Sequence, residues 1–109
     1  MKILFVCSAN YQRSKTAEDH FKKTNSEHTY KSAGTNHKEC DKKGTNKLTD
    51  ELMNWADIVF VMEQKHADII HKFGQAKYDH KVKILEIEDI YQYNSPELIE
   101  ILEAKINLV

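Results

Sequence analysis

Cysteine, glycine, proline and tryptophan are scarce in this 109-residue chain, which contains two, three, one and one of them. Two cysteines, Cys7 and Cys40, exclude a disulfide framework, so we expect a protein of the reducing cytoplasm with Cys7 as a free thiol. No apolar run approaches the ~20 residues that span a bilayer, and the opening run KILFV is too short for a secretory signal. Lys and Arg (16) nearly balance Asp and Glu (17), which gives no electrostatic reason to bind nucleic acid or a membrane.

Short apolar runs alternate with segments of helical periodicity along the chain. This alternation predicts one α/β domain, residues 1–109, with a parallel sheet covered by helices on both faces. Since ligands bind beyond the carboxyl ends of such strands, the loop at residues 7–14 is the expected site. The expected strands are 2–6, 28–34, 57–62 and 81–85, and the expected helices are 15–24, 49–56, 63–74 and 96–106. Ser14 and Ser95 are expected to cap the N-termini of the first and last helices, and Gly74 is expected to end the helix that begins at residue 63. Residues 35–47 are expected to form an irregular loop.

The loop VCSANYQRS places a cysteine at the end of a strand and an arginine where a helix begins. The amides of such a turn form an anion site, but the loop lacks the glycines and lysine of a nucleotide-binding loop. The amides and Arg13 favour the Cys7 thiolate, and the Arg13 guanidinium fits two oxygens of a tetrahedral oxyanion. A thiolate beneath a bound phosphate is placed to attack phosphorus and form a phosphocysteine.

The alternative interpretation of Cys7 is a small apolar residue buried at the end of a strand, which is the commoner role of a lone cysteine. The complete C-x5-R-S spacing between a strand and a helix favours the nucleophile instead.

The same loop resembles the phosphate-binding loop C-x-x-N-x-x-R-S of the low-molecular-weight protein tyrosine phosphatases, whose fixed letters fall on Cys7, Asn10, Arg13 and Ser14. KSAGT (31–35) and WADIVFVME (55–63) are similar to the family's SAGT and ADLILVMD segments, and the chain most resembles a compact bacterial branch. The resemblance implies a three-layer α/β/α, phosphotyrosine phosphatase I-like fold whose four-stranded parallel sheet has the order 2-1-3-4.

The resemblance also implies a role for each residue of the loop. Cys7 is the nucleophile, Arg13 binds the phosphoryl oxygens and Ser14 hydrogen-bonds the sulfur. Asn10, which tolerates left-handed backbone, holds the loop together with Ser32. Many members carry a second, protective cysteine where this chain has Gln12. The implied phosphate-binding residues are Ser8, Ala9, Asn10, Tyr11, Gln12 and Arg13.

A leaving phenolate needs a proton, so a carboxylic acid is expected across the loop. The family takes it from an Asp-Pro-Tyr motif, whose nearest match here is Asp89-Ile90-Tyr91, with isoleucine in place of proline. Asp89 is therefore the implied general acid, and Glu86 and Glu88 are the alternatives.

Aromatic side chains that flank a phosphate pocket select long aryl phosphates over phosphoserine. Tyr11 and Tyr91 are the expected aromatic walls of the phosphate pocket, with Tyr93 behind them. Alternatively, Tyr91 and Tyr93 are simply half-buried residues of a loop. Six histidines occur, but His66 and His71 do not share a helix face and no metal-ligand spacing exists. Neither a metal nor another cofactor is expected.

Together these features predict a phosphomonoester hydrolase, with phosphotyrosine as the substrate class and a phosphorylated protein or small aryl phosphate as the partner. The chain is expected to be a monomer or weak dimer. One alternative is a weak or inactive phosphotyrosine-binding module, since Asp-Pro is missing. Two further alternatives are an arsenate reductase and a phosphocarrier similar to the sugar phosphotransferase IIB proteins. The small number of cysteines argues against the first, and Arg13 argues against the second, because those phosphocarriers lack an arginine at the end of the loop.

Overall fold

The structure, a computed structural model, describes residues 1–107. Strands and helices alternate along it as the apolar pattern predicts, and each predicted strand is present within two residues of its expected ends. In chain order the elements are β1 (Lys2–Cys7), α1 (Arg13–Thr24), β2 (Thr29–Gly34), α2 (His37–Lys43), α3 (Asp50–Trp55), β3 (Ile58–Val61), α4 (Gln64–Gly74), the 3-10 turn η1 (Asp79–Lys81), β4 (Val82–Ile84) and α5 (Pro96–Lys105).

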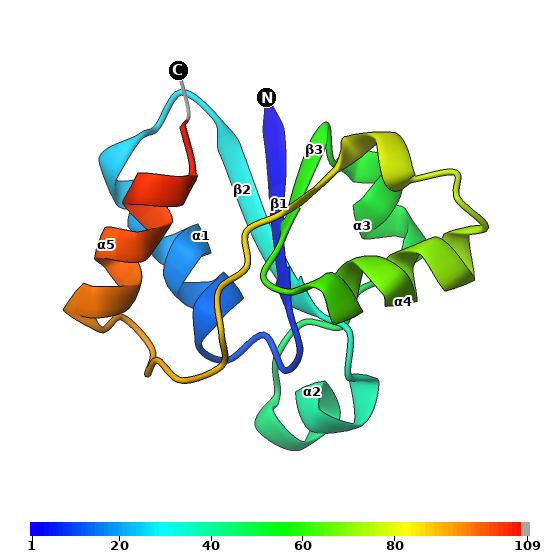
Figure 1. Ribbon diagram of the computed structural model, residues 1–109, viewed down its shortest axis with the longest axis horizontal. Coiled ribbons are helices and arrows are strands. Elements are labelled where there is room, and N and C mark those ends of the chain that lie inside the picture. The colour runs from blue at the N-terminus through cyan, green and yellow to red at the C-terminus, as the bar shows by residue number, and fades with distance from the viewer. Residues whose placement is uncertain (108–109) are drawn as a thin grey trace.

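The four strands form one parallel sheet in the order β2-β1-β3-β4. Helices α1 and α5 cover one face of this sheet, and α3 and α4 cover the other (Figure 1). This arrangement confirms the predicted three-layer α/β/α fold and the strand order 2-1-3-4. The helices within residues 1–107 are all too short or too polar to traverse a lipid bilayer.

Strand β1 is buried along most of its length because helices lie over both of its faces. Phe5 packs on the side of α1 and α5, where its ring stacks on Phe21 with 5.8 Å between the centroids. Val6 packs on the side of α3 and α4. This two-sided packing fixes the end of β1, and with it Cys7, at the carboxyl edge of the sheet.

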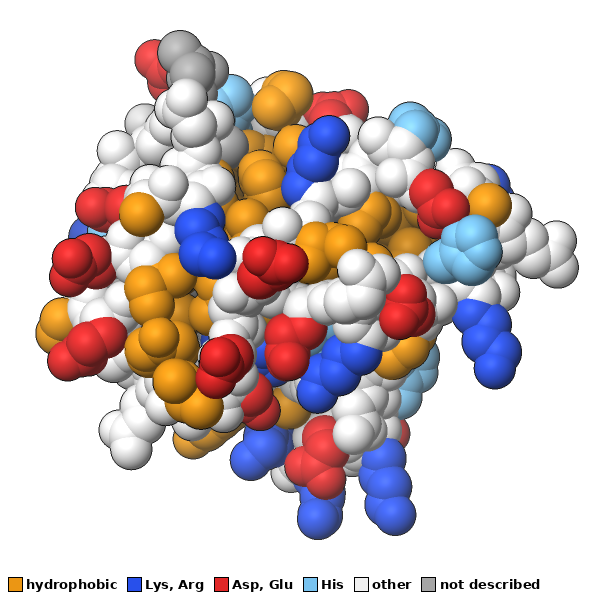
Figure 2. Space-filling model, viewed as in Figure 1, with side chains coloured by type: hydrophobic (Ala, Val, Ile, Leu, Met, Phe, Trp, Pro, Cys, Tyr) orange, Lys and Arg blue, Asp and Glu red, His pale blue; other side chains and the backbone are white. Residues whose placement is uncertain are grey.

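Residues 35–47 are not the irregular loop that the sequence predicts, because helix α2 forms within them. The Asn36 side chain accepts a hydrogen bond from the Glu39 amide at 3.1 Å and caps the helix. Gly44 ends it with left-handed backbone, φ 69°. Cys40 is fully buried and attaches the helix to the body of the protein, and the remaining residues of α2 stay at the surface. Figure 2 shows basic side chains with acidic ones among them over this part of the molecule.

The ends of the other helices agree with the sequence except at α1. That helix begins at Arg13, two residues before its predicted start, and Ser14 is not its cap because the Ser14 side chain turns toward Cys7 instead. The predicted cap of α5 is confirmed, since Ser95 Oγ accepts a hydrogen bond from the Leu98 amide. Gly74 is the last residue of α4, as predicted.

Candidate active site

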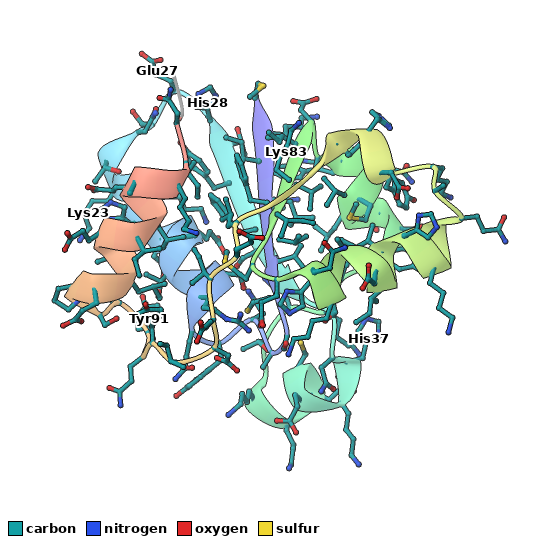
Figure 3. All side chains as sticks on the ribbon, viewed as in Figure 1. Lys23, Glu27, His28, His37, Lys83 and Tyr91 are labelled. Carbon is teal, nitrogen blue, oxygen red and sulfur yellow. The ribbon has the colours of Figure 1, made fainter. Side chains whose placement is uncertain are left out.

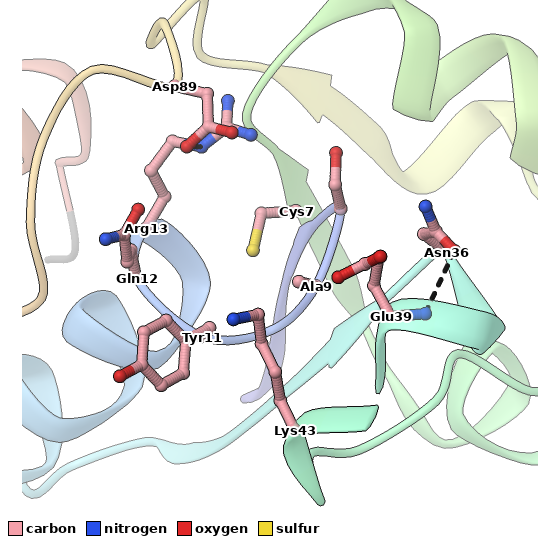
Figure 4. A pocket seen from close by; sticks show the side chains of 10 residues that line it. Cys7, Ala9, Tyr11, Gln12, Arg13, Asn36, Glu39, Lys43 and Asp89 are labelled. Carbon is pink, nitrogen blue, oxygen red and sulfur yellow. Dashed lines mark hydrogen bonds and ion pairs between the residues drawn. The ribbon is translucent and has the colours of Figure 1, made fainter. Parts of the chain in front are cut away.

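The loop between β1 and α1 curls around a pocket of about 370 Å³ at the carboxyl edge of the sheet. The Cys7 sulfur points into this pocket, and Asp89 lies beside Arg13 on one side of it (Figure 4). Glu39 and Lys43 of α2 form the opposite side. The lining residues are Cys7, Ser8, Ala9, Tyr11, Gln12, Arg13, Asn36, Glu39, Lys43 and Asp89.

The loop is supported from below by strand β2 and the segment after α2. A Cβ atom at Gly34 would lie 2.4 Å from the Ser8 carbonyl oxygen and 2.9 Å from the Asn10 nitrogen, so a residue without a side chain is needed there. Asn10 has left-handed backbone, φ 53°, and its Oδ1 accepts a hydrogen bond from the Asn46 amide at 3.1 Å. Ser32 reaches the loop indirectly, because its carbonyl oxygen accepts from the Asn46 side chain at 3.2 Å.

Ser14 presents a hydroxyl to the Cys7 sulfur inside the protein. The Ser14 Oγ and Cys7 Sγ atoms are 2.9 Å apart, and both side chains are buried. Ser14 Oγ also accepts a hydrogen bond from Asn10 Nδ2 at 2.8 Å. Since the asparagine occupies one lone pair of this oxygen, the hydroxyl proton is free to point at the sulfur, where it would stabilise negative charge.

Arg13 is held almost entirely inside the protein, with 1% of its surface exposed. Its Nη1 donates to Glu63 Oε2 at 2.6 Å and to the Ile87 carbonyl oxygen at 2.7 Å. Burial alone would raise the pKa of Glu63, but the hydrogen bond and charge of Arg13 outweigh it and hold that pKa below its ordinary value. The guanidinium is thus fixed in one orientation by an ionised carboxylate behind the loop.

Asp89 lies on the segment between β4 and α5, with its Oδ1 3.7 Å from Arg13 Nε and its side chain 57% exposed. This segment is tied down at both ends, by Arg13 on the Ile87 carbonyl and by a hydrogen bond from the Asn94 amide to Thr16 Oγ1 at 2.8 Å. The alternative acids, Glu86 and Glu88, do not line the pocket.

Of the predicted aromatic walls, the pocket contains Tyr11 but not Tyr91. The Tyr11 ring lies 4.5 Å from Lys43 Nζ, so the two close one side of the mouth. Tyr91 packs instead against the apolar cluster under α1 and α5, away from the pocket (Figure 3). Tyr93 hydrogen-bonds Asp19 at 2.5 Å. In this structure Tyr91 thus lies outside the pocket lining, and the role of Tyr91 as a wall stays a prediction.

Several solved structures share this fold. A low-molecular-weight protein tyrosine phosphatase from Bacillus subtilis is 31% identical over 79% of this chain and 71% of its own, with a TM-score of 0.65. This chain belongs to the low-molecular-weight protein tyrosine phosphatase family. A phosphatase fold implies a phosphorylated substrate, and the family likeness agrees with the resemblance of the loop sequence.

Two further matches show how broad this phosphatase family is. The YwlE arginine phosphatase from Geobacillus stearothermophilus is 26% identical over 95% of this chain and 82% of its own, with a TM-score of 0.66. The tyrosine phosphatase Wzb from Escherichia coli K30, solved with phosphate, shares the fold at 22% identity, with 95% and 91% of the two chains covered and a TM-score of 0.76. The sequence matches no protein-family model and no curated protein significantly.

Two residues that contact the loop of this candidate site, Glu63 and His66, were not predicted from the sequence. His66 is fully buried, and its Nε2 lies 2.9 Å from Ser8 Oγ. Its Nδ1 accepts a hydrogen bond from the Glu63 amide at 3.1 Å, so the proton of the neutral ring is on Nε2 and is donated to Ser8. Among residues 1–107, no three His, Cys, Asp or Glu side chains are grouped as metal ligands would be.

Burial, with the nearby Arg13 charge, lowers the pKa of His66 from 6.5 to about 4. Between these two pH values the unfolded chain binds a proton that the folded protein excludes, so stability is lost as the pH falls. We expect the free energy of unfolding to decrease by about 3 kcal/mol from this cause between pH 7 and pH 4.

Urea unfolding at a series of pH values measures this loss. The matched variant is His66→Gln, whose amide can still donate to Ser8 but does not titrate, and its unfolding curve should lack this part of the pH dependence. Equal pH dependence in the two proteins would show that His66 is not the titrating group.

Proposed function

We propose that this protein is a cysteine-dependent phosphomonoester hydrolase that forms a phosphocysteine on Cys7. The observation that supports this best is the Cys7 sulfur at the floor of a pocket, 2.9 Å from the Ser14 hydroxyl, with a buried arginine and an exposed carboxylate beside it. This is an arrangement of nucleophile, oxyanion partner and proton donor within one pocket.

The first step is attack of the Cys7 thiolate on phosphorus. The loop amides and Arg13 bind the equatorial oxygens, so charge that spreads over them in the transition state is stabilised. As the P–O bond to the leaving group breaks, Asp89 transfers its proton to that oxygen.

The second step is hydrolysis of the phosphocysteine. Asp89, now ionised, takes a proton from a water molecule that attacks phosphorus. The P–S bond breaks, the thiolate leaves with the Ser14 hydroxyl as its hydrogen-bond donor, and inorganic phosphate is released. The protein returns to its starting protonation state.

Phosphotyrosine is the substrate class that we favour, because Tyr11 offers its ring to an aryl group at the mouth of the pocket. Phosphoarginine is a second candidate, supported by a different observation. Two carboxylates, Glu39 and Asp89, line the pocket, and carboxylates are the natural acceptors for the N–H groups of a guanidinium. A YwlE arginine phosphatase is also among the similar structures.

The experiment that tests the function compares p-nitrophenyl phosphate, a phosphotyrosine peptide and phosphoarginine as substrates at mildly acidic pH. We expect turnover of both aryl phosphates, at a higher kcat/KM than that of phosphoarginine. A clear preference for phosphoarginine would select the second candidate. A protein that binds the peptide but turns over none of the three would be a binding module.

Asp89→Asn is expected to lower kcat for phenyl phosphate by about 10²-fold, because phenolate is a poor leaving group that needs the proton. The effect on p-nitrophenyl phosphate should be smaller, since p-nitrophenolate leaves readily without protonation. Steady-state kinetics on both substrates measure the difference. The matched control is Glu88→Gln, one residue away and outside the pocket lining, and equal turnover by Asp89→Asn and the wild type would exclude Asp89 as the acid.

A further inference from the structure

A groove continues from the catalytic pocket into the space between α2 and α4. Next to the pocket lies a hollow of about 440 Å³ that shares Ser8 and Asn36 with it. Beyond that lies a third hollow of about 410 Å³, which shares Thr35, His37 and Ile69 with the second. Since each hollow shares lining residues with the next, the three lie in a row that begins at the catalytic pocket, and this row is called the groove below. Figure 3 shows His37 at the end of α2 that faces α4.

The chemistry of this groove changes along its length. The part next to the pocket is polar, with His37 and the exposed amine of Lys65. The far part is apolar, where Leu48 forms the base and Ile69 and Phe73 the side. Acceptors and donors near the pocket suit the backbone and polar side chains of a bound peptide, whereas the far end suits an apolar side chain.

Ile69 and Phe73 are large apolar side chains that lie at the surface of α4. They occur four residues apart on α4 and therefore share one face of the helix, with 43% and 42% of their surfaces exposed. The core-facing residue of the same helix, Ile70, is completely buried. Two adjacent large apolar side chains beside a hollow gain about 25 cal/mol for each Å² that a partner removes from water, and such patches mark interaction sites.

We propose that this groove binds the polypeptide of the substrate on one side of its phosphorylated residue, with a large apolar side chain of the substrate seated against Ile69 and Phe73. The proposal rests on the proposed function, which fixes the phosphorylated residue in the catalytic pocket. From there the substrate chain has to leave the pocket, and the groove begins at the pocket's own wall, at Ser8 and Asn36. Continuity with the catalytic pocket thus identifies the occupant as the substrate chain.

Kinetics with two kinds of substrate test this. A set of phosphotyrosine peptides carries one phenylalanine, moved through successive positions on either side of the phosphorylated residue, in an otherwise Gly/Ser background. We expect one position to raise kcat/KM about tenfold, and we expect Ile69→Ala with Phe73→Ala to abolish that gain. Hydrolysis of p-nitrophenyl phosphate, which is too small to reach the groove, should be unchanged and shows that the variant is folded.

The matched control is Ile84→Ala, since Ile84 is similarly exposed (39%) but lies on β4 outside the groove. A phenylalanine gain that survives in the double variant, or that Ile84→Ala also removes, would overturn the proposal. So would a peptide series without any preferred position. The single variant Ile69→Ser repeats the test without touching the Phe73 contact with Tyr78.

Failure of the proposed function has a different signature. If the wild type hydrolyses no aryl phosphate, the function is wrong, and the groove is then tested by the dissociation constants of the same peptides from fluorescence polarisation. A change in oligomeric state on Ile69→Ala with Phe73→Ala, seen by light scattering, would identify the patch as a contact between copies of this chain and overturn the assignment to substrate.

Discussion

Cys7→Ser is expected to lower kcat for p-nitrophenyl phosphate by at least about 10³-fold, the scale on which loss of a catalytic nucleophile acts. Sulfur is a far better nucleophile than a serine hydroxyl, which keeps its proton without a general base. The Ser14 hydroxyl beside it can donate a hydrogen bond but cannot remove that proton. The loop amides and Arg13 are unchanged in the variant. Inorganic phosphate should therefore still bind, as its protection against thermal unfolding would show.

The control for Cys7→Ser is Cys40→Ala, at the other cysteine. Cys40 is buried beneath the loop, and its sulfur lies 3.9 Å from the Ser8 carbonyl oxygen, a weak contact. Its loss should lower the melting temperature slightly and leave kcat within a few-fold of the wild type. Retention of kcat in Cys7→Ser, or equal losses in both variants, would contradict a nucleophilic Cys7.

Arg13→Lys is expected to lower kcat/KM by about 10²- to 10³-fold, as the removal of an oxyanion-stabilising donor does elsewhere. Lysine keeps the positive charge but presents a single ammonium group in place of the planar fork. Here the Arg13 Nη1 is already committed to Glu63 and the Ile87 carbonyl, so the rest of the guanidinium is left to meet the phosphate. An ammonium cannot make both sets of contacts at once.

Glu63→Gln separates the two roles of the arginine. The amide oxygen can still accept from Nη1, so the guanidinium keeps a hydrogen bond in place while it loses its ionic partner. We expect a much smaller loss of kcat/KM than in Arg13→Lys, measured with p-nitrophenyl phosphate. Wild-type kinetics in Arg13→Lys would show that Arg13 does not bind the phosphate. If Arg13→Lys does not fold, Glu63→Gln still shows whether kcat/KM depends on how the Arg13 guanidinium is held.

The sequence predicted those parts of the site that are carried by local pattern. The run KILFV is buried on both faces as expected, and it delivers Cys7 to the edge of the sheet. Asp89 was predicted as the acid from its likeness to the family's Asp-Pro-Tyr motif, and in the structure it lines the same pocket as Cys7. Helix α2 could have been predicted from its ends, since Asn36 and Gly44 are typical cap residues. It was missed because its polar sequence lacks apolar periodicity.

The missing parts depend on contacts between distant segments. Glu63 and His66 precede or open a helix like many surface residues, and nothing in their spacing indicates that one would pair with Arg13 and the other would reach Ser8. The place of Tyr91 was not predicted, for the opposite reason. Its place next to Asp89 suggested the pocket, but the direction of a loop side chain is set by what packs behind it, here the apolar cluster under α1 and α5.

The absence of a side chain at Gly34 has a consequence for the cost of product release. Because β2 and Asn46 hold the loop in shape, an incoming oxyanion meets a loop that is already ordered, and little free energy is needed to order it. The ordered loop binds the product, inorganic phosphate, as readily as it binds the phosphate group of the substrate. Inorganic phosphate should compete with substrate for the pocket. The rate of turnover should therefore fall as the free phosphate concentration around the protein rises, and should increase with the supply of phosphorylated substrate.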